Sequence, residues 1–97
     1  MTYDEALHET PVVLVEFFAT WCPHCRRMMP VVEQVKELLD GESAVIQLDI
    51  DENKELASEA QVDGVPTFII YRDGNEMWRH SGEIDGNALL AKVQSYQ

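Results

Sequence analysis

The sequence predicts an α/β fold in which helices cover both faces of a mixed four-stranded sheet. Segments with strand composition and segments with helical periodicity alternate, in the order helix, strand, helix, strand, helix, strand, strand, helix. Two strands joined by a helix pair in parallel, whereas two strands joined by a tight turn pair antiparallel. With 97 residues, 45% of them hydrophobic, the chain is expected to form one domain over residues 1–97.

The chain starts with a short predicted helix and its most apolar strand. Thr2 and Glu5 have the spacing of a capping box, so a helix is expected over residues 3–8. The segment PVVLVEFFA, residues 11–19, is apolar on both alternating faces, which is typical of a central strand covered on two sides. Glu16 is the only charged residue in this strand.

A longer helix is expected to begin at the cysteine pair and to stop before Gly41. Its apolar residues recur at helical spacing. They are Met28, Val31, Val32, Val35, Leu38 and Leu39. Pro30 lies inside this helix, and its missing amide and bulky ring are expected to kink the axis.

The middle of the chain contains a second strand and a short helix. AVIQLDID, residues 44–51, has strand composition, and residues 53–62 form a helical pattern in which Leu56 and Ala60 face inward. The segment GVPT, residues 64–67, ends this pattern.

The last third predicts a hairpin and a final helix. The strands TFIIYR and NEMWRHS flank Asp73-Gly74, a dipeptide that favours a tight antiparallel turn. Asp85 is expected to cap the last helix. The inward residues of that helix are predicted to be Leu89, Leu90, Val93 and Tyr96.

Charge and hydropathy argue against two classes of partner. Seven basic and eighteen acidic residues give a net charge of -11, so nucleic acid and anionic membranes are expected to repel the protein. The longest apolar run, residues 12–15, is far shorter than the roughly 20 residues of a membrane span. The first ten residues lack the basic and apolar regions of a secretory signal, so a cytoplasmic location is expected.

The stretch ATWCPHCRR holds the only two cysteines of the chain. It follows a central strand, at the end of the sheet where α/β proteins place their chemistry. An inert disulfide closing so short a loop would add little stability. A zinc site would need a second ligand pair, which His8, His24 and His80 do not provide at a defined spacing. The pattern therefore favours a reacting dithiol and no metal.

The segments WCPHC and GVPT, together with Glu16, Pro30 and Gly82, resemble the thioredoxin family from about Thr2 to the C-terminus. The resemblance implies the thioredoxin fold and a monomeric thiol-disulfide oxidoreductase that reduces disulfides in proteins. It implies no cofactor beyond the cysteine pair, which a thioredoxin reductase would recharge with electrons from NADPH. A non-catalytic adaptor with the same fold would not need both cysteines and Glu16.

Two features depart from thioredoxins proper. The dipeptide Pro23-His24 between the cysteines resembles that of DsbA, a periplasmic disulfide donor. The alternative function is therefore a disulfide oxidase or isomerase, similar to DsbA or to protein disulfide isomerase, in an oxidising compartment. Thioredoxins also begin with an extra strand, which this chain is expected to lack.

The residues of the CPHC segment have separate expected roles. Cys22 heads the helix, where free amides favour a thiolate, and is expected to attack substrate disulfides, whereas Cys25 resolves the mixed disulfide. An imidazolium at His24 would lower the pKa of Cys22 and make the pair more oxidising than in ordinary thioredoxins. The alternative is a solvated histidine without effect. Arg26 and Arg27 add positive charge, although solvated surface residues are the simpler interpretation.

The remaining candidates lie outside the CPHC segment. By resemblance, Glu16 accepts the proton of Cys25, with a pKa raised by burial, and Gln47 replaces the lysine that usually accompanies this acid. The alternative is a glutamate that reaches solvent from an edge strand. By resemblance, Pro66 follows a cis bond and faces the dithiol. The expected substrate-binding residues are Trp21, Pro23, Gly64, Val65, Thr67 and Gly82.

Overall fold

Four strands form one mixed sheet in the order β2-β1-β3-β4. A computed structural model describes residues 2–97; Met1, which belongs to the predicted domain, lies outside the described residues. The strands are β1 (Val12–Phe18), β2 (Ala44–Asp49), β3 (Thr67–Arg72) and β4 (Asn75–Ser81). β1 pairs in parallel with β2 and antiparallel with β3, and β3 pairs antiparallel with β4. The predicted sheet is confirmed.

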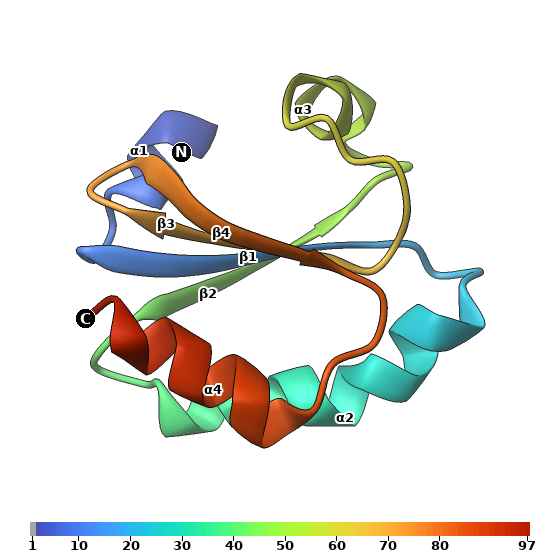
Figure 1. The fold of residues 1–97 in the computed structure, drawn as a ribbon. Coiled ribbons are helices and arrows are strands. Elements are labelled where there is room, and N and C mark those ends of the chain that lie inside the picture. Colours follow the sequence, from blue (N-terminus) through green and yellow to red (C-terminus); the bar gives the residue numbers. More distant parts are fainter. Residues whose placement is uncertain (1) are drawn as a thin grey trace.

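Helices cover both faces of this sheet, as the sequence predicts (Figure 1). α1 (Tyr3–Leu7) and α3 (Lys54–Glu59) lie over one face, and α2 (Pro23–Leu38) and α4 (Gly86–Ser95) lie over the other. The order of the elements is the predicted one, and their ends differ from the predicted ends by at most a few residues.

Strand β1 is the centre of the core because both of its faces are covered. Side chains alternate between the two faces of a strand. Val13, Val15 and Phe17 pack into the cluster under α1 and α3, whereas Val12 and Leu14 pack against α2 and α4. Glu16 continues the α2 side of this alternation and is 2% exposed. The continuous apolar run of the strand thus reflects two cores rather than one.

Helix α2 begins at the cysteine pair and runs without interruption past Pro30, where the expected kink stays a prediction. Its buried residues are Cys25, Met28, Val32 and Val35. The inward orientation predicted for Leu38 is wrong, because this side chain is 56% exposed. Leu39, four residues after Val35, takes the next inward position instead and is fully buried.

Several predicted local signals are present. Thr2 and Glu5 form both hydrogen bonds of a capping box at α1. The carboxylate of Asp85 accepts a hydrogen bond from the amide of Ala88 and caps α4. Asp73 and Gly74 have φ angles of 50° and 82°, which a tight hairpin of this type requires.

The inward residues predicted for the α3 and α4 segments pack against the core, and Ala57 of α3 is buried in addition. Leu56 and Ala60 of the α3 segment pack against the core but stay half-buried, and the buried residue of α3 is Ala57. In α4, Leu89 and Val93 are fully buried, whereas Leu90 and Tyr96 pack at the border of the core.

The outer strand β2 pairs only with β1. Within residues 2–97, the short helix α1 is the one element that precedes β1, so no further strand covers β2. The described residues also contain no helix long and apolar enough to cross a membrane.

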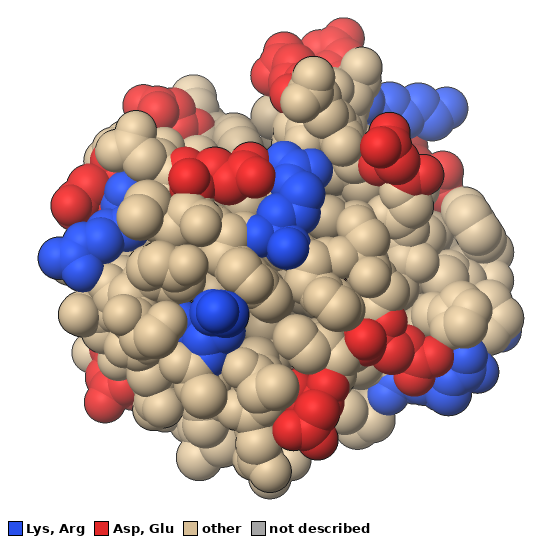
Figure 2. Space-filling model, in the orientation of Figure 1, with Lys and Arg blue, Asp and Glu red and all other residues tan. Residues whose placement is uncertain are grey.

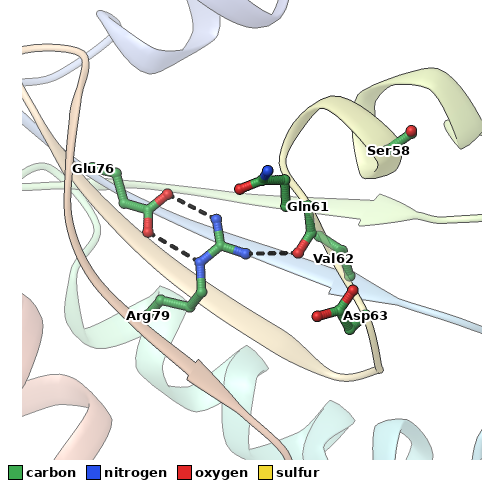
Figure 3. A pocket seen from close by; sticks show the side chains of 6 residues that line it. All are labelled: Ser58, Gln61, Val62, Asp63, Glu76 and Arg79. Atoms are coloured by element: carbon green, nitrogen blue, oxygen red, sulfur yellow. Dashed lines mark hydrogen bonds and ion pairs between the residues drawn. The ribbon is translucent and has the colours of Figure 1, made fainter.

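Arg79 of β4 ties the end of α3 to the sheet (Figure 3). Its guanidinium forms two hydrogen bonds with Glu76, of 2.8 and 3.0 Å, and donates to the carbonyl oxygens of Ala60 and Gln61. A surface hollow of about 700 Å³ surrounds these groups. Because the charge of Arg79 is already neutralised and its donors are engaged, we interpret the hollow as a structural joint.

The two-sided packing of β1 predicts a large cost for shortening Leu14. Leu14→Ala removes a fully buried side chain and leaves a cavity, so we expect it to lower the free energy of unfolding by about 2–5 kcal/mol. Leu38→Ala, at an exposed position, is the matched control and should change stability by no more than about 0.5 kcal/mol. Denaturant unfolding measures both, and equal effects would contradict the assignment of the core.

Candidate active site: a dithiol above a buried carboxylate

The two cysteines lie where the chain has left β1 and begins α2. Cys22 is the N-cap residue of α2, Pro23 is its first residue and Cys25 lies within its first turn. Proline suits that first position because the amide it lacks would have no partner inside the helix. Both cysteines are free thiols, 4% and 2% exposed, so only a small part of each sulfur meets solvent.

The surroundings of the two thiols shift their acidities in opposite directions. Desolvation alone would raise the pKa of Cys22, but hydrogen bonds from Cys25 and from the His24 amide, together with the charge of Arg26, lower it overall. Burial raises the pKa of Cys25 to about 11, and the neighbouring Cys22 and Glu16 add to this rise. Cys22 is therefore the thiol that ionises first.

A second loop faces Cys22. The thiol of Cys22 lies 3.6 Å from the carbonyl oxygen of Val65, and the Val65–Pro66 peptide bond is cis. The amide of Gly82 donates to the carbonyl of Pro66 at 2.8 Å. The hydroxyl of Thr67 donates to the carbonyl of Gly64 at 2.6 Å. The loops before β3 and after β4 are thus fastened to each other beside the thiol.

Trp21 lies immediately before the dithiol and is 61% exposed. Its indole nitrogen donates a hydrogen bond of 2.9 Å to the carboxylate of Asp51, in the segment after β2. The bond holds a large apolar ring at the surface in one orientation. Asp51 thus helps to position Trp21, a contact that no pattern in the sequence indicates.

Glu16 lies in the core on the same side of the sheet as α2. Residues 16 and 47 are register partners on the parallel strands β1 and β2, and the amide of Gln47 donates to Glu16 at 3.1 Å. Burial raises the pKa of Glu16, and the bond from Gln47 opposes only part of that rise. The alternative of an edge-strand glutamate is wrong, because β1 lies inside the sheet.

A cavity of about 250 Å³ connects this carboxyl group with the second cysteine. Its walls come from the end of β1, the start of α2 and β2. They are Glu16, Phe18, Ala19, Thr20, Cys25, Arg26, Met29 and Gln47. Glu16 and Cys25 therefore line one shared space.

The side chain of His24 points to partners other than Cys22, whereas the sequence led us to expect an imidazolium acting on the thiol. Within residues 2–97 its ring forms hydrogen bonds with Glu83 and Arg27, and the part of His24 that lowers the pKa of Cys22 is its main-chain amide. Arg27 also binds Glu83, and the two partners lower the pKa of Glu83 to about 2, with Arg27 the larger cause. No pattern in the sequence indicates Glu83, because an acidic residue after Gly82 is typical of a solvated surface.

The three histidines do not join the dithiol in a metal site. In the part of the chain that the structure describes, no group of three or more His, Cys, Asp or Glu side chains could hold a metal ion. His8 bonds to the carbonyl of Asp4 on α1, and His80 bonds to the carbonyl of Glu83. His8 and His80 thus bind carbonyl groups close to them in the sequence. The acidic side chain that shares a cavity with the dithiol is Glu16.

The fold and this site define a class of α/β proteins that carry a pair of cysteines, separated by two residues, at the start of a helix. Comparison with known proteins identifies the family. The family model described as Thioredoxin matches residues 1–95, so the chain belongs to the thioredoxin family.

Individual relatives agree with this assignment. The chain is 34% identical over 95 residues to a chloroplastic thioredoxin Y of Oryza sativa subsp. japonica, covering 97% of this chain and 56% of the relative. It is 41% identical over 66 residues to a thioredoxin of Staphylococcus epidermidis, covering 68% of this chain and 64% of that protein. The chain thus spans less than two thirds of the length of these curated relatives.

Solved structures show the same fold. A mutant thioredoxin from Halobacterium salinarum NRC-1 superimposes with a TM-score of 0.88 at 39% identity, over 96% of this chain and 80% of that one. The oxidised thioredoxin of Plasmodium falciparum gives 0.82 at 28% identity, over 97% and 88% of the two chains. The predicted thioredoxin fold is confirmed.

Burial of Glu16 predicts a pH-dependent cost that glutamine removes. Since the folded state raises this pKa, the carboxyl group favours folding below its ordinary value near 4.5, and that contribution is lost as pH rises through the raised value. Glu16→Gln should therefore gain stability over the parent as pH rises, by about 1.4 kcal/mol for each pH unit that separates the folded-state pKa from the ordinary value.

Denaturant unfolding over a pH series measures this gain. Glu33→Gln, at an exposed position of α2, is the control for the loss of one acidic group. A stability difference between Glu16→Gln and the parent that stays constant with pH would contradict the raised pKa.

Proposed function

We propose that this chain is a thiol-disulfide oxidoreductase that reduces disulfide bonds in other proteins, using Cys22 for attack and Cys25 for resolution. The observation that carries the proposal is the placement of the two free thiols. Cys22 is the N-cap of α2, and Cys25 lies one turn further on and lines a cavity with Glu16, so the pKa of the first thiol is lowered and that of the second is raised. A pair of structural cysteines has no need for such a difference, whereas a nucleophile and a resolving thiol require it.

The first step is attack by Cys22. Its thiolate sulfur forms a bond to one sulfur of the substrate disulfide, that disulfide bond breaks, and the other substrate sulfur leaves as a thiolate that takes a proton from solvent. Main-chain amides at the start of α2 hold the attacking thiolate, and the positive end of the helix dipole supports it.

The second step needs a base because Cys25 stays protonated at neutral pH. The Cys25 proton passes to Glu16 through the shared cavity, and the new thiolate attacks the sulfur of Cys22. A disulfide forms between Cys22 and Cys25, and the second substrate sulfur leaves and is protonated. Two electrons have then moved from the protein to the substrate.

The surface beside Cys22 suits an extended peptide. The main chain at Val65 and the cis Pro66 lie next to the thiol, and Gly82 has a φ of 98° and no side chain to obstruct a partner. Main-chain hydrogen bonds to such a loop bind peptides with little regard to sequence. The proposed docking residues are Trp21, Pro23, Gly64, Val65, Thr67 and Gly82, with Pro66 at their centre.

The proposed partners follow from the family. Disulfide-containing proteins are the substrates, and a thioredoxin reductase drawing on NADPH would restore the dithiol. We place this cycle in the cytoplasm and expect a monomer. No resident cofactor is needed, because the reacting sulfurs belong to the chain.

The dipeptide Pro23-His24 favours a second candidate, a disulfide oxidase or isomerase of the DsbA or protein disulfide isomerase kind. In that case the same steps run in the opposite direction, and the disulfide between Cys22 and Cys25 is passed to a substrate dithiol. A helix N-terminus with a histidine supports a potential above the thioredoxin value of about -270 mV. Binding of the imidazole to Glu83 weakens this effect, so reduction remains the preferred direction.

Reduction of insulin disulfides by dithiothreitol tests the proposal. We expect the parent chain to accelerate it and Cys22→Ser to abolish the acceleration. Cys25→Ser should retain attack but not resolution, so that it accumulates a mixed disulfide with the substrate, visible by mass spectrometry under non-reducing conditions. A mixed disulfide carried by Cys25 in the variant Cys22→Ser, at the parent's rate, would reverse the assigned roles.

Glu16→Gln tests the base in the same system. It should form the mixed disulfide at the parent's rate and resolve it about 10²-fold more slowly, as loss of a general base does. Equal rates of resolution would remove Glu16 from the mechanism while leaving both cysteines in place.

The reduction potential tests the contribution of His24. Equilibration with glutathione buffers should give a potential above about -270 mV for the parent, and His24→Pro should lower it. An unchanged potential in His24→Pro would show that the imidazole has no effect on the dithiol.

A further inference from the structure

A cluster of three charged or titratable side chains lies next to the dithiol and takes no part in the proposed transfers of protons and sulfur bonds. His24 and Arg27 come from the start of α2, and Glu83 comes from the segment between β4 and α4. The imidazole nitrogen Nδ1 of His24 lies 2.7 Å from Oε2 of Glu83, and Arg27 binds the same oxygen at 2.8 and 3.0 Å. Figure 2 shows acidic and basic side chains in contact at the end of the molecule where α2 begins.

The Nδ1 atom of the His24 imidazole has a hydrogen-bond partner whether or not it carries a proton. Nδ1 of His24 also lies 2.8 Å from Nη2 of Arg27. When Nδ1 carries a proton it donates to Glu83, and when it does not it accepts from Arg27. In both states the ring belongs to the cluster, and within residues 2–97 no hydrogen bond joins it to Cys22.

Glu83 also neutralises positive charge close to the thiolate. Arg27 is near enough to Cys22 for the two charges to interact, and it shares its guanidinium with Glu83. A free cation at this position would stabilise the thiolate of Cys22 and hence the reduced protein, which makes a disulfide more oxidising. A carboxylate that binds the cation opposes this stabilisation.

We propose that Glu83 is a positioning residue that holds the His24 imidazole in a cluster with Arg27 and so keeps the dithiol more reducing than its CPHC sequence predicts. The proposal rests on the proposed function only in taking Cys22 and Cys25 as a reversible redox pair. It explains how a DsbA-like dipeptide can occur in a chain whose relatives are thioredoxins.

Glu83→Gln tests this role in a glutathione redox equilibrium. In the reaction measured, two glutathione thiols supply two electrons and two protons, the Cys22–Cys25 bond breaks, and one glutathione disulfide forms. Glutamine keeps the shape of the side chain but not its charge. We expect the equilibrium to shift about tenfold toward the protein dithiol, which corresponds to a potential about 30 mV more oxidising.

Two controls separate positioning from bulk charge. Glu33→Gln removes one negative charge at an exposed position of the same helix, eight residues after Cys25 and thus about 12 Å further along the axis. Glu83→Gln made in a His24→Ala background should shift the equilibrium by less than half as much as in the parent, because the part that acts through the imidazole is gone.

Each result has a defined meaning. A larger shift for Glu83→Gln than for Glu33→Gln, reduced when His24 is absent, supports the proposal. Equal shifts for the two glutamates, or a Glu83→Gln shift that is undiminished in His24→Ala, overturn it. If the parent protein shows no reversible dithiol-disulfide equilibrium at all, the proposed function fails before Glu83 is tested, so the two failures cannot be confused.

Discussion

The burial of β1 on both faces is the constraint on which the rest of the structure depends. A strand that is covered on one face can carry charged residues on the other, but β1 is covered on both faces and carries a single carboxyl group, on the side of α2. The same strand ends shortly before Cys22. The packing that holds β1 in the sheet therefore also positions the start of α2 relative to Glu16. Stability and chemistry therefore use the same element.

In the site, two chemically identical thiols have different surroundings. Cys22 and Cys25 are both buried, yet the free amides at the helix start act mainly on the first, whereas the second lines a cavity together with Glu16. Glu16 has a neutral partner, Gln47, so the carboxyl group is hydrogen-bonded without being paired with a cation. A neutral partner leaves the carboxyl group its affinity for a proton, which a cation would reduce.

Patterns in the sequence were sufficient for the sheet and helices but not for the side chains that connect distant segments. The capping box at Thr2, the turn at Asp73-Gly74 and the apolar run of β1 are local signals, and each appears in the structure as predicted. The inward orientation predicted for Leu38 is wrong, because helical spacing alone cannot distinguish the two neighbouring leucines at the end of α2. The partner of His24 is Glu83, 59 residues away, and a contact at that separation depends on how α2 and the β4–α4 segment pack.

Among residues 2–97, strand β2 is an edge strand with no further strand on its outer side. No residue of this edge strand is fully buried, and neither proline nor lysine lies within it to prevent another strand from pairing there. Acidic residues flank it instead, with Asp40 and Glu42 before it and Asp51 and Glu52 after it. Two copies meeting edge to edge would bring these like charges together, so electrostatic repulsion opposes pairing at this edge. Association at this edge is thus coupled to ionic strength, because salt screens exposed charges and weakens the repulsion between them.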